Sequence, residues 1–167
     1  MNKKGHVMNA VLLAIGVGYV LEPAGDVSTF VAIAQVFMPL VLGALFPDVD
    51  TAFGKHRKTL HNLPILAVFF AYPYFFNNLN FVWAGILTHY LLDMVGSRRG
   101  IALFYPLWDE EFGMPSGVTT SSKFAEVVTV FVTLIELAAF AGVYYLLPEY
   151  LPPGLNLVKQ ASLAFGI

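Results

Sequence analysis

Residues 46–62 read Phe-Pro-Asp-Val-Asp-Thr-Ala-Phe-Gly-Lys-His-Arg-Lys-Thr-Leu-His-Asn, a polar stretch that separates two strongly apolar segments. It contains two carboxylates, Asp48 and Asp50, and two imidazoles, His56 and His61. Carboxylates and imidazoles this close together are a suitable donor set for a divalent metal ion. We therefore expect the chain to be organised around a polar site at which this stretch meets residues from other segments.

The composition of the 167-residue chain is that of a membrane protein. It is 57% hydrophobic and 12% charged, whereas soluble domains carry about 25% charged residues, and its mean hydropathy is +0.70. A soluble domain needs more polar surface than this, so the sequence predicts an integral membrane protein. Cysteine is absent, which excludes disulfides and a Cys-based zinc site. The basic residues are few and scattered, so we expect no nucleic-acid partner.

Five apolar runs follow one another along the chain, at residues 7–21, 28–46, 63–76, 81–95 and 124–147. They are continuous rather than alternating, and an open sheet cannot lie in lipid, so they predict helices. A span needs about 20 apolar residues; the second and fifth runs supply them, and the others must include their polar ends. We expect an all-α integral membrane protein, a bundle of about five transmembrane helices formed by residues 1–153, with a short tail at 154–167.

The first run has an alternative interpretation as a signal peptide, because Lys3 and Lys4 precede it. Residues 22–26, Glu-Pro-Ala-Gly-Asp, are typical of a turn and not of a small-residue cleavage site. We therefore expect the N-terminal segment to be retained as the first helix.

The basic residues segregate when five helices cross in sequence. The N-terminus and the loops at 47–62 and 96–122 then share one side of the membrane, and only Lys159 lies on the other. The basic residues on the first side are Lys3, Lys4, Lys55, Arg57, Lys58, Arg98, Arg99 and Lys123. The positive-inside rule predicts that this side is cytoplasmic, in a multi-pass protein of the plasma or inner membrane.

The same topology brings candidate metal ligands to one membrane face. They come from the start of the first helix, the loop between the second and third, and the last turns of the fourth: His6, Asp48, His61, His89 and Asp93. His89 and Asp93 lie four residues apart and so share one helical face. Glu126, about 5 Å along the fifth helix, is the sixth candidate. Taken singly, Asp48 could also belong to a solvated turn, and His89 with Asp93 to a polar pair at a helix end.

Other polar residues have supporting roles in this hypothesis. Asp50 and His56 are the catalytic candidates, either orienting a ligand or acting as the general base. Three arginines are topology charges by default and phosphate anchors in the functional interpretation, since a guanidinium binds phosphate through two parallel hydrogen bonds: Arg57, Arg98 and Arg99. Glu136, about 20 Å along the fifth helix, is expected to be a buried carboxyl with hydrogen bonds across helices.

The ordered set of these residues resembles one family. Pro47-Asp-Val-Asp50, His56-Arg57, His61 and His89-x-x-x-Asp93, with His6 at the start, are similar to the YdjM family over about residues 1–106. These membrane proteins are described as metal-dependent hydrolases, some labelled LexA-binding and inner-membrane-associated. The chain departs from the family's His-Arg-x-x-Thr-His-Ser pattern at Leu60 and Asn62. A more distant likeness to zinc-dependent phospholipase C implies zinc ligation by Asp48, His61, His89 and Asp93, and by Glu126.

The function that these observations predict is that of a membrane-bound hydrolase dependent on a divalent metal ion, with zinc as the expected ion. Its substrate would be an ester or phosphoester, with membrane lipid as the expected partner. The alternative is a non-enzymatic membrane protein, either a metal or proton carrier or a structural subunit. A carrier should place polar groups through the full membrane depth, whereas here they gather at one side.

Overall fold

The computed structural model describes residues 2–115, 117–119 and 122–150. These form helices α1 (Lys3–Leu21), α2 (Val27–Leu45), α3 (Leu63–Phe76), α4 (Val82–Gly96) and α5 (Ala125–Tyr150), and the short 3-10 helix η1 (Pro47–Ala52). No strand occurs in these ranges, which contain only two isolated β-bridges. The predicted all-α class and the five helices are confirmed, while the predicted tail at 154–167 lies outside the described residues.

Polar residues between the apolar runs begin three of the helices. Asn2, Asp26 and Asn62 each accept a hydrogen bond from a backbone N–H of the first turn that follows, which satisfies a donor that the helix itself cannot. α3 ends at Asn77, whose φ of 51° is the left-handed conformation common after a helix. These caps explain why the helices begin and end close to the limits of the apolar runs.

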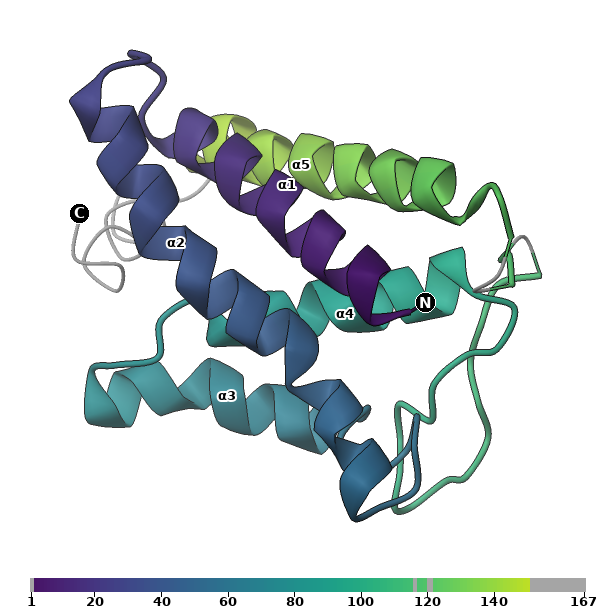
Figure 1. Ribbon diagram of the computed structural model, residues 1–167. Helices are drawn as coiled ribbons and strands as arrows, with labels where there is room; N and C mark the ends of the chain where they lie inside the picture. The colour runs from purple at the N-terminus through teal and green to yellow at the C-terminus, as the bar shows by residue number, and fades with distance from the viewer. Residues whose placement is uncertain (1, 116, 120–121, 151–167) are drawn as a thin grey trace.

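The helices pack so that four of their ends meet at one end of the bundle. α1 packs against both α2 and α5, while α4 packs against α2 and α3, and Figure 1 shows α1 between α2 and α5 with α4 crossing below them. The N-terminus, η1, the end of α4 and the start of α5 all lie on the right of Figure 1. The segments predicted to share one side are therefore gathered at one end of the molecule.

Among the described residues, three segments are long and apolar enough to cross a membrane: Lys3–Leu21, Val27–Ala52 and Ala125–Leu146. α3 has 14 residues and α4 has 15, short of the roughly 20 that a straight span requires. The prediction of an integral membrane chain is thus supported by three helices. The count of five spans is not confirmed.

Two glycines bring α2 and α4 into backbone contact. A Cβ added to Gly43 would lie 2.9 Å from Gly85 Cα, and one added to Gly85 would lie 2.8 Å from both Gly43 Cα and Ala44 N. Real side chains do not occupy such positions, so the crossing requires two residues without Cβ. Because His89 is one helical turn beyond Gly85, this crossing also sets the position of His89 relative to the end of α2.

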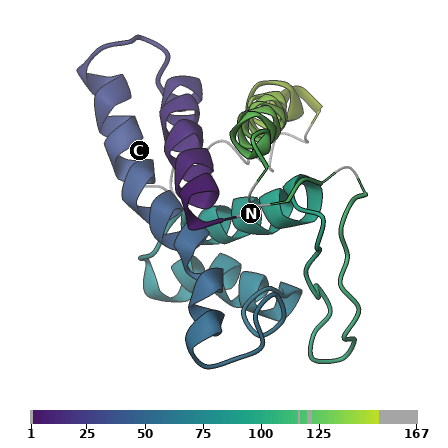
Figure 2. The same ribbon diagram turned by 45° about the vertical axis from the view of Figure 1, so that its right-hand side comes forward.

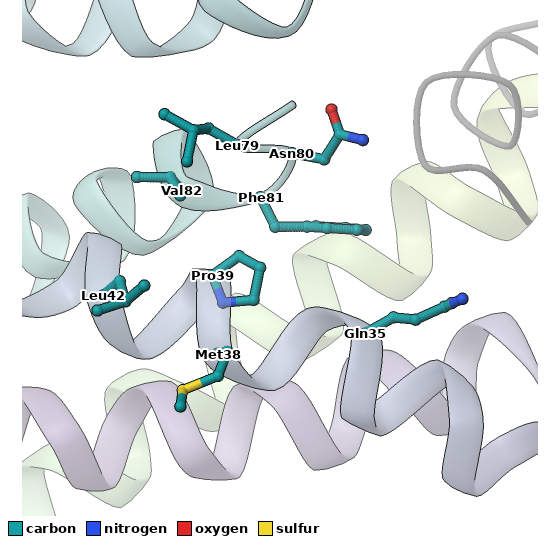
Figure 3. A pocket seen from close by; sticks show the side chains of 8 residues that line it. All are labelled: Gln35, Met38, Pro39, Leu42, Leu79, Asn80, Phe81 and Val82. Atoms are coloured by element: carbon teal, nitrogen blue, oxygen red, sulfur yellow. The ribbon is translucent and has the colours of Figure 1, made fainter. Parts of the chain in front are cut away.

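An open apolar pocket lies near the other end of α4, where α2 passes the turn that precedes α4 (Figure 3). None of its lining residues is titratable, so it offers no group for acid–base or metal chemistry. They are Gln35, Met38, Pro39, Leu42, Leu79, Asn80, Phe81 and Val82.

Candidate metal centre

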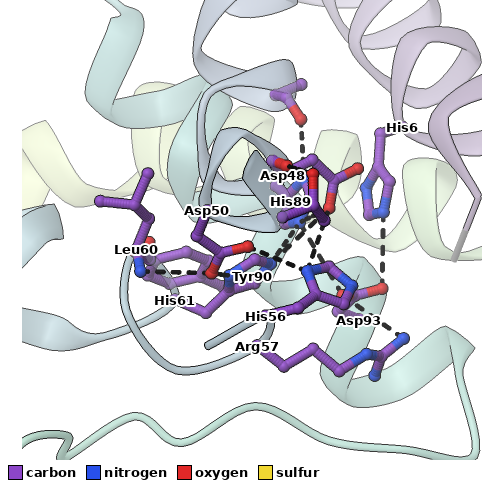
Figure 4. A network of polar contacts seen from close by, with 12 residues as sticks. His6, Asp48, Asp50, His56, Arg57, Leu60, His61, His89, Tyr90 and Asp93 are labelled. Carbon is purple, nitrogen blue, oxygen red and sulfur yellow. Dashed lines mark hydrogen bonds and ion pairs between the residues drawn. The ribbon is translucent and has the colours of Figure 1, made fainter. Parts of the chain in front are cut away.

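Five of the six predicted ligands come together where α1, η1 and α4 meet the segment before α3 (Figure 4). All five are buried: His6 in α1, Asp48 in η1, His61 in the segment before α3, and His89 and Asp93 in α4. Buried carboxylates and imidazoles are costly unless they are paired or bind a metal ion. Their convergence from segments up to 87 positions apart (93 − 6) therefore marks a site and not a local turn.

The donor atoms fall into two adjoining triads. In one triad His6, His89 and Asp93 each place a ligand atom within 4.8 Å of the others. The other triad, Asp48 with His56 and His61, meets the same criterion. Asp48 links the two, since its Oδ1 lies 3.9 Å from Nε2 of His61 and 3.8 Å from Nε2 of His89. Asp48 thus lies close to one histidine of each triad.

The tautomers of His61 and His89 leave two lone pairs facing each other. Nδ1 of His61 donates to Oδ2 of Asp50 at 2.9 Å, and Nδ1 of His89 donates to the carbonyl oxygen of Ala44 at 2.6 Å. A neutral imidazole has a single N–H, so both Nε2 atoms are acceptors, and they lie 3.0 Å apart. Two acceptors at this distance repel unless a cation lies beside both. The donor set therefore fits a divalent metal ion.

The surroundings of His6 are an independent indication of a metal site. Both of its ring nitrogens are buried without a hydrogen-bond partner in the described part of the chain. Its Nε2 lies 3.4 Å from Oδ1 of Asp93, and its ring stacks on that of His89 with centroids 3.7 Å apart. Buried polar atoms are normally satisfied, and a metal ion held by His6 and Asp93 would satisfy one of these two nitrogens.

Asp50 forms hydrogen bonds with two of the histidines. Its fully buried carboxylate accepts from Nδ1 of His61 and, at 3.0 Å, from Nδ1 of His56. It also lies 3.4 Å from the backbone N–H of Leu60. Burial lowers the pKa of His61, with partial opposition from the Asp50 charge, so His61 remains neutral and able to ligate. The side chain of His56 is 41% exposed and forms the side of the cluster open to its surroundings.

Arg57 lies at the edge of the cluster, with Nη2 3.7 Å from Oδ2 of Asp93. Its Nη1 donates to Ser97 Oγ and Gly100 O, both at 3.1 Å, and to Arg99 O. The buried guanidinium thus holds the chain after α4 against the site. Arg98 and Arg99 are exposed. Arg99 forms an ion pair with Glu111 that lowers the pKa of this carboxyl.

Glu126 is not brought into the cluster. Its exposed side chain pairs with Lys4 at 2.5 Å. In the first turns of α5, the buried face is formed by Ala125 and Thr129, and Glu126 lies off that face. The number of residues from the start of α5 gives the distance of Glu126 along the helix. It does not give the direction of the side chain, which depends on the rotation of α5 about its axis.

Two groups that sequence reasoning missed complete the site. Tyr90 donates from its hydroxyl to Leu60 O at 2.6 Å and accepts from the backbone N–H of Asn62 at 3.1 Å, so it fixes the backbone on both sides of His61. Its position next to His89 was a signal that could have been used. The carbonyl of Ala44 is one of the last four of α2, which lack partners within the helix, but no side-chain pattern identifies which histidine would meet it.

One of the comparisons with known proteins found a match. The profile of the family described as YdjM inner membrane protein matches residues 1–151, well beyond the 1–106 over which the motifs carry the resemblance. Comparisons with curated proteins and with solved structures gave no match. The family match covers α1 to α5 and includes every residue of the cluster. The chain therefore belongs to the YdjM inner membrane protein family.

Proposed function

We propose that the chain is a membrane-bound hydrolase that depends on a divalent metal ion and cleaves an ester or phosphoester at the membrane interface. The observation that carries the proposal is the 3.0 Å approach of two imidazole acceptors, one from the 47–62 stretch and one from α4. Both rings are oriented from behind by hydrogen bonds at Nδ1, which is the usual support for metal-ligating histidines.

The residues that would hold the ion are His61, His89 and Asp48, with His6 and Asp93 completing the shell or holding a second ion. Imidazole nitrogens and carboxylate oxygens without thiolates suit zinc among the common divalent ions, although similar sets bind other transition metals. Zinc is thus the ion we propose. A bound divalent ion supplies a nucleophile at neutral pH by lowering the pKa of a water, and it stabilises negative charge on the ester under attack.

The chain's own acid–base group in this proposal is His56. It is the exposed member of the cluster, and its Nδ1 already donates to Asp50. A histidine held in this way can accept a proton from an attacking water at its other nitrogen and pass it to the solvent. Asp50 would stabilise the resulting imidazolium while keeping His61 in its ligating tautomer.

A phosphoester of a membrane lipid is the substrate class that fits the location. The site lies at one end of a bundle of apolar helices (Figure 1), where headgroups would be within reach. Arg57 is the arginine nearest the cluster and is the proposed phosphate anchor, whereas Arg99 is paired with Glu111. We further propose that this end faces the cytoplasm, on the basis of the basic residues gathered there.

One observation favours the alternative of a proton or metal carrier. Glu136 accepts hydrogen bonds from Asn9 at 2.9 Å and from Thr88 at 2.8 Å, so polar groups continue from the cluster along α1, α4 and α5. A carrier needs such groups through the membrane depth. A hydrolase needs only those at the end where the ligands lie.

Turnover measurements on the zinc-loaded protein separate the two functions. The substrates are water-soluble chromogenic phosphate esters and carboxylate esters, and vesicles of phospholipid. The hydrolase should cleave at least one of them, and His56→Ala should slow cleavage by roughly 100-fold or more without loss of bound zinc. Lys55→Ala, in the same loop, is the matched control. Zinc uptake into sealed vesicles without cleavage of any ester would favour the carrier.

A further inference from the structure

The loop between α4 and α5 contains a hairpin with an apolar tip. Ile101 and Phe112 pair in antiparallel fashion, with N–H···O distances of 3.1 and 2.8 Å. Figure 2 shows the two arms of this hairpin extending away from the helices on the right of the view. The tip is an ordered turn, since Leu107 N and Trp108 N both donate to Phe104 O, at 3.0 and 3.2 Å.

The hairpin is tied, both at its base and beside its tip, to the stretch that supplies Asp48 and His61. Ala102 N donates to Arg57 O at 2.9 Å, and Lys58 Nζ donates to Asp109 O at 3.0 Å. Lys55 Nζ lies 6.0 Å from the centre of the Tyr105 ring. These contacts are made by the residues on either side of His56, so the hairpin keeps a constant position beside the exposed side of the cluster.

The tip presents large apolar side chains that stay exposed although Phe112 packs against two of their rings. Leu107 is 95% exposed, Trp108 57% and Phe104 44%. The ring of Trp108 lies 6.4 Å from that of Phe104, centre to centre, so these side chains form one patch. An ordered, exposed apolar patch rimmed by charged residues marks a contact surface, and here the rim is formed by Lys58, Asp109 and the Arg99–Glu111 pair.

The bilayer itself is the occupant that fits this patch. The chain belongs to an inner membrane family, and the hairpin lies at the end of the bundle where the candidate spans Lys3–Leu21 and Ala125–Leu146 begin. Tryptophan is enriched at the headgroup level of membranes because its ring is amphipathic. An apolar tip flanked by charged residues matches the change from acyl chain to headgroup across that boundary.

We propose that the tip formed by Phe104, Leu107 and Trp108 inserts into the headgroup boundary of the membrane that the helices cross. Insertion holds the exposed side of the cluster, at His56, against the lipid surface. If the proposed hydrolase function is correct, the site then receives its ester from the headgroup layer of the same membrane. The insertion itself does not depend on metal binding or turnover.

The two tryptophans of the chain, Trp83 and Trp108, allow a direct test by fluorescence. Trp83→Phe leaves Trp108 as the only reporter, and Trp108→Phe is the matched control that reports on Trp83 in α4. Each variant is reconstituted at several protein-to-lipid ratios in phosphatidylcholine vesicles with bromine near the headgroup end of the acyl chain. The fluorescence of inserted Trp108 should be strongly quenched by this lipid and weakly quenched by aqueous acrylamide. Both degrees of quenching should be the same at every protein-to-lipid ratio.

Two results would overturn the proposal. Strong quenching of Trp108 by acrylamide without quenching by brominated lipid would place the tip in water. Protection from both quenchers that grows with protein density would indicate contact with a second protein copy. As a second variant, Leu107→Asp in the Trp83→Phe background should reduce lipid quenching of Trp108 while leaving the zinc content unchanged. Retained lipid quenching in Leu107→Asp would also count against insertion of the tip.

Discussion

Replacing Gly85 by Ala tests how the crossing of α2 and α4 builds the metal centre. The added Cβ would lie 2.8 Å from Ala44 N and from Gly43 Cα, and closer still to Leu40 O. The shortest contact, 2.3 Å to Leu40 O, is 1.1 Å below the 3.4 Å at which ordinary contacts of a Cβ begin (3.4 − 2.3), so the two backbones must separate by about 1.1 Å. All three contacts are with backbone atoms, and no side-chain rotation can relieve them.

Separating α2 from α4 also lengthens the hydrogen bond between His89 of α4 and Ala44 of α2. Nδ1 of His89 lies 2.6 Å from Ala44 O, and a separation of about 1.1 Å along this direction lengthens this distance to about 3.7 Å, beyond the range of an N–H···O bond. Overpacking of this kind costs about 1–3 kcal/mol of folding stability. Loss of the group that orients a ligating histidine lowers metal affinity by about 10- to 100-fold.

Gly142→Ala is the matched control, because in the described residues no atom outside its own stretch of helix lies within 4 Å of its added Cβ. In the helical α5 this substitution should be neutral or stabilise by about 0.5–1 kcal/mol. Zinc titration and thermal unfolding in detergent measure both effects. Wild-type zinc affinity and an unchanged melting temperature in Gly85→Ala would refute the reasoning, since the helices would then cross without the close approach.

The remaining predictions concern positioning, depth and orientation. Asp50→Asn should weaken zinc binding by about 10- to 100-fold, because an amide at this position no longer selects the His61 tautomer; Glu126→Gln, outside the cluster, should leave the zinc titration unchanged. Glu136→Gln should keep the full zinc content, since its hydrogen bonds go to Asn9 and Thr88 and not to a ligand; loss of zinc would place the site deeper and support the carrier. Accessibility labelling of cysteines introduced at the N-terminus and at the exposed Glu110 should report the cytoplasmic side for both, and opposite sides would exclude the predicted topology.

Much of the fold could be predicted from local sequence. The helix limits follow apolar runs that end at polar caps such as Asn62 and at left-handed residues such as Asn77, and these are properties of a few neighbouring residues. The convergence of His6, His61 and His89 also followed from the alternation of helix directions. The number of spans could not be predicted in this way, because α3 and α4 are too short for hydropathy alone to decide whether they cross the membrane.

The features that sequence could not predict depend on rotation and on backbone atoms. Glu126 faces away from the cluster, because its direction depends on how α5 rotates against α1. The role of Asp50 as the partner of both His56 and His61 requires the path of η1, which no periodicity encodes. The contact of His89 with the Ala44 carbonyl depends on the glycine crossing of two helices far apart in sequence.

The measurement that tests the central claim most directly is the metal content of the detergent-purified protein by elemental analysis. We expect bound zinc in the wild type and in Lys55→Ala. Asp48→Ala and His89→Ala, each shown to be folded by circular dichroism, should lose most of it. Because the ligands share one site, the double variant should lose little more than either single one. Full metal occupancy in both Asp48→Ala and His89→Ala would contradict a shared metal centre, and with it the proposed hydrolase.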